Sequence, residues 1–197
     1  MTAPNYYFVF DVESIGLHGE GYAVGYVVVD PSGIEMESGR FACPPSDAMG
    51  DDSDREWVEK NIPRIPANCC DTNLVRVKFW EQWMKWKAKG AVLVSDCGWP
   101  VEARFLAACV DWDTASRKWE GPYPLHDLAS VMLANGIDPM GNFDRLEDEL
   151  PKHDPLCDAR QSARLFVSLV GRAAGAGVGL EPSAAEEKYN VRMSDGL

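Results

Sequence analysis

The hydrophobic pattern near the N-terminus predicts three β-strands in quick succession. Residues 6–10 form an apolar run of aromatic and β-branched side chains, which is the composition of a buried strand. Residues 22–30 and 34–42 form two further strands, joined by the tight turn Pro31-Ser32-Gly33. Such short connections predict an antiparallel meander of three strands.

The rest of the chain alternates predicted helices with two short strands, at residues 91–95 and 124–126. Helices are predicted over residues 55–61, about 72–89, 101–110, 127–134 and 155–173, with loops at 111–123 and 135–150. This order predicts one α/β domain over residues 1–174, with a mixed five-stranded sheet flanked by helices. Residues 175–197 are rich in Gly, Ala and Ser and predict a weakly ordered C-terminal tail.

The long helix at about residues 72–89 carries a stripe of aromatic and aliphatic side chains bordered by Arg and Lys. One interpretation is a stacking platform with a basic rim for single-stranded nucleic acid. The other is an amphipathic helix that packs on the sheet and keeps its basic face in water. The second interpretation is the more common arrangement and is favoured here.

Composition narrows the class of protein. A net charge of −12 over 197 residues argues against broad attraction to nucleic acid and predicts local or end-directed binding. No apolar run approaches the ~20 residues of a membrane span, and no basic region precedes the first apolar run. We therefore expect neither a membrane segment nor a signal peptide. The six cysteines form no CxxC pair, which favours a reducing, cytoplasmic compartment.

Two acidic residues, Asp11 and Glu13, come directly after the first apolar run. Residues i and i+2 of an extended chain point to the same face, so both carboxylates should project from the C-terminal end of a central strand. Ligands bind at that end in open α/β sheets. Two such charges are costly unless a cation lies between them, and Mg²⁺ or Mn²⁺ prefers oxygen ligands. The alternative is a solvated strand end.

A second group with possible chemistry lies at the start of the last predicted helix. Asp158 falls in the first helical turn, where the helix dipole favours a carboxylate, and His153 lies in the loop before it. A neutral histidine beside a bound cation can take a proton from water. The alternative is a surface histidine and an ordinary capping residue.

Taken together, these motifs resemble the DEDDh 3′–5′ exonucleases, a DnaQ-like family of the ribonuclease-H-like superfamily. DVESIGL, starting at Asp11, is similar to the family's first motif, and HDPLCDARQSARLF, starting at His153, is similar to its third. The resemblance spans roughly residues 6–172. It implies a ribonuclease-H-like fold, two divalent ions (Mg²⁺ or Mn²⁺) and hydrolysis of nucleotides from a 3′ end.

The resemblance also implies roles for individual residues. The implied metal ligands include Asp11, Glu13 and Asp158, and His153 is the implied general base. The implied contacts to the terminal nucleotide are Ser14, Gly16 and Leu17.

The second motif departs from the family pattern. The family has an Asp in the first turn of the helix after the fourth strand, where this chain has Glu102. Asp96 lies six residues earlier, at the end of the predicted strand. Glu102 fits the motif register, whereas Asp96 has the family's residue type and a position beside the strand that carries Asp11. Both stay candidates for the remaining catalytic carboxylate, with a slight preference for Asp96 as the metal ligand.

The expected function is metal-dependent 3′–5′ exonuclease activity on a single-stranded RNA or DNA 3′ end, with RNA slightly favoured. One alternative is a phosphodiesterase acting on short oligonucleotides or small nucleotides. Another is a non-catalytic interaction module that keeps the fold.

Overall fold

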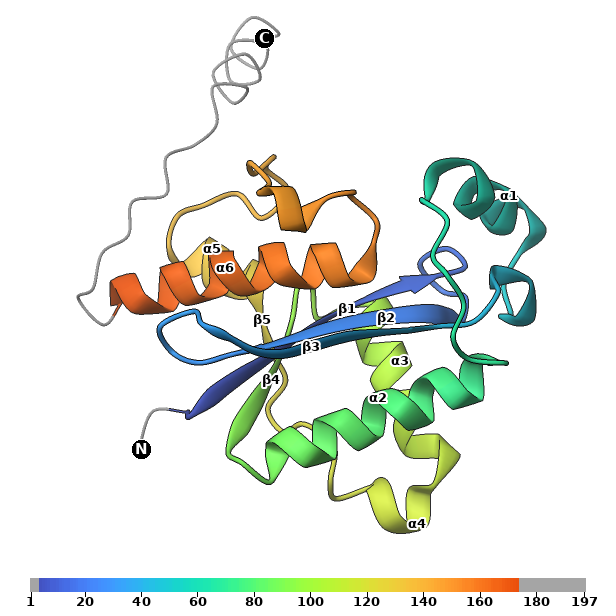
Figure 1. The fold of residues 1–197 in the computed structure, drawn as a ribbon, viewed down its shortest axis with the longest axis horizontal. Coiled ribbons are helices and arrows are strands. Elements are labelled where there is room, and N and C mark those ends of the chain that lie inside the picture. Colours follow the sequence, from blue (N-terminus) through green and yellow to red (C-terminus); the bar gives the residue numbers. More distant parts are fainter. Residues whose placement is uncertain (1–3, 174–197) are drawn as a thin grey trace, which may run out of the picture.

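The computed structural model describes residues 4–173 (Figure 1). The strands are β1 Tyr6–Ser14, β2 Gly21–Val29, β3 Glu35–Ala42, β4 Ala91–Ser95 and β5 His126–Asp127. The helices are η1 Pro45–Asp47, α1 Asp52–Asn61, α2 Thr72–Lys87, α3 Val101–Trp112, α4 Thr114–Arg117, α5 Leu128–Ala134, η2 Glu147–Glu149 and α6 Pro155–Ala173. The predicted tail at 175–197 lies outside the described residues.

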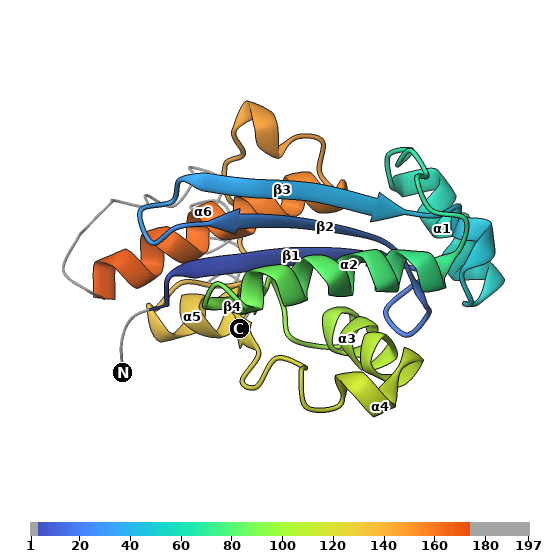
Figure 2. The ribbon, with the colours of Figure 1, turned by 60° about the horizontal axis from the view of Figure 1, so that its bottom comes forward.

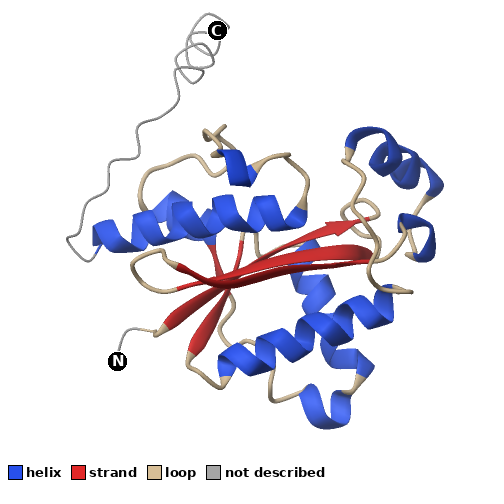
Figure 3. Cartoon of the chain, viewed as in Figure 1, coloured by secondary structure: helices blue, strands red, loops and turns tan. Residues whose placement is uncertain are grey.

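The sheet has the strand order β3-β2-β1-β4-β5, so β1 is the central strand. Figure 3, coloured by secondary structure, shows the strands gathered between helices. β1 pairs with β2, and β2 with β3, in antiparallel fashion. β4 and β5 continue the sheet with parallel pairing. The predicted mixed five-stranded α/β fold, an antiparallel meander plus two parallel strands, is therefore confirmed.

Helices cover both faces of the sheet. α2 and α3 lie on one face and α5 and α6 on the other, as the two views agree (Figures 1 and 2). β1 contributes alternate residues to the two cores, because successive side chains of a strand point to opposite faces. Phe8, Phe10 and Val12 pack toward α2 and α3, whereas Tyr7 and Val9 pack toward α6. This alternation determines which helix each later residue of β1 faces.

The aromatic stripe of α2 is part of the core. Trp80, Trp83 and Trp86 are only 5%, 3% and 4% exposed. The indole N–H groups of two of them are used inside the fold, because Trp83 donates to the Glu120 carbonyl and Trp86 to the Glu37 carboxylate. The stacking-platform interpretation of this helix is therefore wrong, and the amphipathic packing interpretation is confirmed.

Several boundaries differ from the predictions. β1 continues to Ser14 instead of ending at residue 10, α1 begins at Asp52 instead of residue 55, and β5 lies at His126–Asp127 instead of 124–126. The predicted loop at 111–123 contains the short helix α4, which begins where the Asp113 carboxylate accepts a hydrogen bond from the Ser116 amide. Local capping therefore created a helix that hydrophobic periodicity did not indicate.

Within residues 4–173, none of the helices combines the length and the apolar character that crossing a membrane requires. The six cysteines are all unpaired.

Candidate active site

Asp11 and Glu13 lie within β1 itself, on the face that packs against α6. They continue the alternation of Tyr7 and Val9, which belong to the core beneath that helix. β4 ends beside Phe10, so the carboxyl end of β1 extends beyond its parallel neighbour. The two carboxylates therefore lie on a part of β1 that has no strand neighbour on the side of β4.

The close approach of α6 to the sheet places Asp158 near these two acids. Gly25 of β2 pairs with Asp11, and a Cβ on Gly25 would lie 2.2 Å from backbone atoms at the start of α6. No other residue type leaves room for the helix there. The carboxylate of Asp154, ion-paired with Arg40 of β3, accepts a hydrogen bond from the Leu156 amide and holds the helix start in place.

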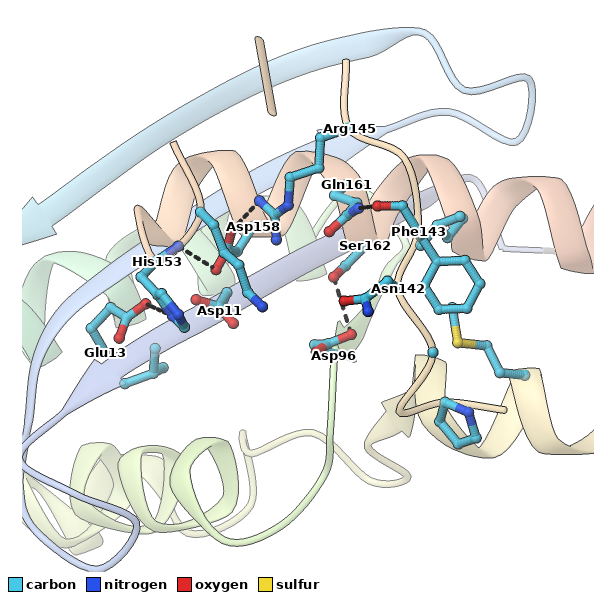
Figure 4. Close-up of a pocket in the computed structure, with 16 residues that line it drawn as sticks. Asp11, Glu13, Asp96, Asn142, Phe143, Arg145, His153, Asp158, Gln161 and Ser162 are labelled. Carbon is cyan, nitrogen blue, oxygen red and sulfur yellow. Dashed lines mark hydrogen bonds and ion pairs between the residues drawn. The ribbon is translucent and has the colours of Figure 1, made fainter. Parts of the chain in front are cut away.

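These residues line a cavity of about 540 Å³ at the carboxyl end of the sheet. Figure 4 shows Asp11, Glu13, His153 and Asp158 together at one end and Asp96 beside Ser162 further along. The Asp158 carboxylate accepts one hydrogen bond from the His153 amide, at 3.1 Å, and pairs with Arg145 Nη1 at 2.5 Å. His153 Nδ1 lies 3.9 Å from Glu13 Oε1.

His153 is held in an unusual backbone conformation. Its φ of 64° lies in the left-handed region, which non-glycine residues seldom adopt. Its side chain is 37% exposed, and its ring meets the Trp57 ring edge-on at 6.3 Å between centroids. Burial lowers the pKa of His153 below its usual 6.5, with the Asp158 charge acting in the opposite direction. The imidazole is therefore neutral at pH 7 and able to accept a proton.

The electrostatics of the site fit a divalent cation. Desolvation, followed by the charges of Glu13, Glu102, Asp158 and Asp96, raises the pKa of Asp11 well above its usual value. Desolvation and the Asp158 charge raise the pKa of Glu13 to about 8. Oxygen and nitrogen atoms of Glu13, His153 and Asp158 all lie within 4.8 Å of one another. Clustered oxygen donors that repel one another suit a hard cation such as Mg²⁺ or Mn²⁺.

The two candidates for the remaining carboxylate approach Asp11 from opposite faces of the sheet. Asp96 follows Val94, which belongs to the core beneath α6, and it accepts a 3.2 Å hydrogen bond from Ser162 of α6. Asp96 therefore lies on the face of Asp11 and lines the same cavity. Glu102 comes from α3, whose Phe105 packs in the opposite core.

Glu102 is only 6% exposed, and its carboxylate accepts a backbone hydrogen bond from Val12. β4 has ended before this point, so the Glu102 carboxylate accepts the hydrogen bond from the Val12 amide that a neighbouring strand would otherwise accept. Burial raises the pKa of Glu102 to about 7, and its charge acts on Asp11 more strongly than that of Asp96. Glu102 is therefore electrostatically coupled to the site without lining the cavity.

Arg145 is a site residue that sequence reasoning missed. Its loop is anchored to α6, because Arg164 makes two hydrogen bonds to Glu149, which is 2% exposed, and one to the Asp144 carbonyl. Arg145 also donates to the Glu149 carbonyl, which holds its guanidinium over Asp158. It lies in a predicted loop with no motif, so no pattern in the chain indicates it.

A second cavity, of about 440 Å³, adjoins the first at Glu13 and His153. It contains the three predicted nucleotide contacts Ser14, Gly16 and Leu17. The Ser14 hydroxyl donates a 2.7 Å hydrogen bond to the Gly16 carbonyl, so its proton is already used within the loop.

Trp57 and Asp54 of α1 also line the second cavity and were not predicted. Trp57 is 53% exposed. A large aromatic residue in a helix whose only other apolar residue is Val58 is the one sequence signal that could have indicated it.

Comparisons with known proteins identify the fold. No protein-family model matches this chain, and no curated protein matches it either. Among solved structures, the zinc-bound form of an E. coli exonuclease I complex with single-stranded DNA superimposes with a TM-score of 0.58 at 12% identity. Exonuclease I from Methylocaldum szegediense gives a TM-score of 0.58 at 15% identity. E. coli exonuclease I with a 5cy-dT13 oligonucleotide gives 0.56 at 12%.

These alignments cover 87%, 85% and 87% of this chain but only 41%, 40% and 41% of the exonuclease I chains. This chain therefore corresponds to about two fifths of those proteins. At this level of identity the comparison establishes the fold, which this chain shares with the corresponding part of the exonuclease I structures.

Proposed function

We propose that this protein is a metal-dependent 3′–5′ exonuclease acting on single-stranded nucleic acid. The observation that carries the proposal is a cluster of mutually repelling carboxylates beside a cavity with an aromatic wall. The neighbouring exonuclease I structures include a complex with single-stranded DNA and one with a 5cy-dT13 oligonucleotide, which supports this proposal. The acidic net charge of −12 fits binding at a chain end better than binding along a polymer.

The cation would be held by the carboxylates that line the first cavity, which are Asp11, Glu13, Asp96 and Asp158. A divalent ion bound there supplies positive charge that stabilises the scissile phosphate and the leaving 3′ oxygen. The protein's own residues orient the reactants around it. His153 accepts the proton of the attacking water, since its lowered pKa keeps the imidazole neutral.

Arg145 and Lys152 add positive charge to a cavity that is otherwise acidic. We propose that they face the phosphate backbone of the substrate, because guanidinium and ammonium groups bind phosphate oxygens. The terminal nucleoside would occupy the second cavity, with its base against Trp57 and its sugar near Gly16 and Leu17.

The test is an assay of 5′-labelled single-stranded RNA and DNA of one sequence, each with Mn²⁺ or with chelator. We expect a metal-dependent ladder of labelled products shortened from the 3′ end. The strand that is degraded faster identifies the preferred sugar. If neither strand is shortened but dinucleotides are cleaved, the protein is a phosphodiesterase acting on short oligonucleotides. If Mn²⁺ produces neither cleavage nor a rise in melting temperature, the non-catalytic interaction module replaces the proposal.

The choice between Asp96 and Glu102 can be tested by metal binding. We expect Asp96→Asn to weaken Mn²⁺ binding by about 10- to 100-fold, because it removes a ligand on the cavity face. Glu102→Gln keeps a hydrogen-bond acceptor for the Val12 amide but removes a charge that acts on Asp11, so it should weaken Mn²⁺ binding less than Asp96→Asn does, by less than about tenfold. Calorimetric titration measures both constants. If the two variants behave the other way round, Glu102 is the ligand.

A further inference from the structure

The described residues that line the second cavity include acidic ones but no Lys or Arg, although it adjoins the cavity where we propose that phosphodiester bonds are cleaved. Its titratable lining residues are Glu13 and the neutral His153 at the border with the first cavity and Asp54 on α1. The cavity therefore offers a phosphate group no cation, in contrast to the first cavity with Arg145 and Lys152.

Asp54 is held where a ligand can reach it. It is half-buried, and its carboxylate makes no hydrogen bond or ion pair with any residue in the described range 4–173. Its carboxylate lies against Gly16, where a Cβ would come within 2.1 Å of Asp54 Oδ2. A side chain at residue 16 would therefore displace the carboxylate from the cavity wall.

The surroundings of Asp54 leave its charge uncompensated. The adjacent Arg55 is turned away, and its guanidinium donates to the carbonyls of Pro45 and Ala48. The N-terminus of α1 carries only about half an elementary positive charge, which is less than the full negative charge of the Asp54 carboxylate in its first turn. A phosphate entering this end of the cavity would meet net negative charge.

We propose that Asp54 makes the second cavity selective for a free terminal nucleoside and thereby restricts cleavage to ends that carry a 3′-hydroxyl. This inference rests on the proposed function. An ionised carboxylate has only acceptor atoms, so a sugar hydroxyl can donate to it. A 3′-phosphate, or a chain that continues past the cavity, presents negative charge and no donor there, and it is repelled.

The experiment uses two 5′-labelled oligonucleotides of one sequence, ending in a 3′-hydroxyl or a 3′-phosphate, at saturating Mn²⁺. Wild-type protein should cleave the hydroxyl end about 100-fold faster, because like charges placed together are strongly disfavoured. Asp54→Asn keeps the size and an acceptor oxygen but removes the charge, and it should reduce this ratio at least about tenfold by speeding cleavage of the phosphate end. Asp52→Asn removes a charge from the same helical turn but outside the cavity. It should leave the ratio unchanged.

A second measurement does not depend on turnover. Calorimetry with a nucleoside 5′-monophosphate and the matching 3′,5′-bisphosphate should show that wild-type protein prefers the monophosphate and that Asp54→Asn loses most of this preference. An unchanged preference in both assays overturns the role of Asp54 and leaves the exonuclease intact. A wild-type protein that degrades neither oligonucleotide overturns the exonuclease proposal, and the inference falls with it.

Discussion

Replacement of Asp11 by Asn is expected to lower the rate of metal-dependent hydrolysis by roughly 10³-fold or more, the scale seen when a central catalytic group is removed. Asp11 lies at the centre of the carboxylate cluster, since the charges of Glu13, Glu102, Asp158 and Asp96 all act on it. The Asn side chain has nearly the same shape but no negative charge, so it cannot replace the carboxylate as a ligand for a divalent cation.

The same substitution should stabilise the metal-free protein. A carboxyl group whose pKa is raised by folding opposes folding whenever it is ionised, so its neutral replacement should raise the free energy of unfolding by roughly 1–3 kcal/mol. For the same reason, the stability of wild-type protein in chelator should fall as the pH rises. For Glu13 this window runs from its usual pKa of 4.5 to about 8.

Urea unfolding in chelator at several pH values measures both effects, and the labelled-oligonucleotide assay measures the rate. Glu59→Gln is a suitable control, because Glu59 is an exposed residue of α1 outside both cavities. An Asp11→Asn protein that hydrolyses at the wild-type rate would contradict the assignment of this residue. A variant that is less stable than wild type at pH 8 would contradict the electrostatic argument.

Replacement of His153 by Asn is expected to lower the rate by about 10²–10³-fold, which is the usual contribution of a general base. The wild-type rate should rise with pH as His153 loses its proton and level off below about pH 7, because burial lowers the pKa of this histidine from 6.5. The variant should lose this ascending limb, since Asn does not titrate in the range.

A metal titration separates this role from a ligand role. His153 lies within 4.8 Å of donor atoms of Glu13 and Asp158, so it is also placed to bind a cation. A general base that does not bind the metal leaves the Mn²⁺-induced rise in melting temperature unchanged in His153→Asn. Loss of that rise would assign His153 as a ligand, and a wild-type rate and pH profile in the variant would remove it from the mechanism.

The sequence by itself determined the layered fold and the placement of the acidic residues on β1 and at the start of α6. Alternation along β1 placed Asp11 and Glu13 on one face, because the side-chain period of a strand is two residues. The start of α6 could be placed at Pro155, which put Asp158 in its first turn. The antiparallel pairing of the first three strands also followed from connection lengths, since short turns join antiparallel neighbours.

The tertiary structure alone decided which residues from distant segments meet. The side of the sheet to which Asp96 and Glu102 belong depends on where β4 ends and which helix follows, and spacing along the chain does not determine this. Arg145, Trp57 and Asp54 lie in segments with no motif, and they reach the two cavities only because their segments pack beside β1 and α6. Local periodicity shows which face of one helix or strand is buried. A site built from several elements depends on how those elements pack against one another, and the pattern within a single segment does not determine that packing.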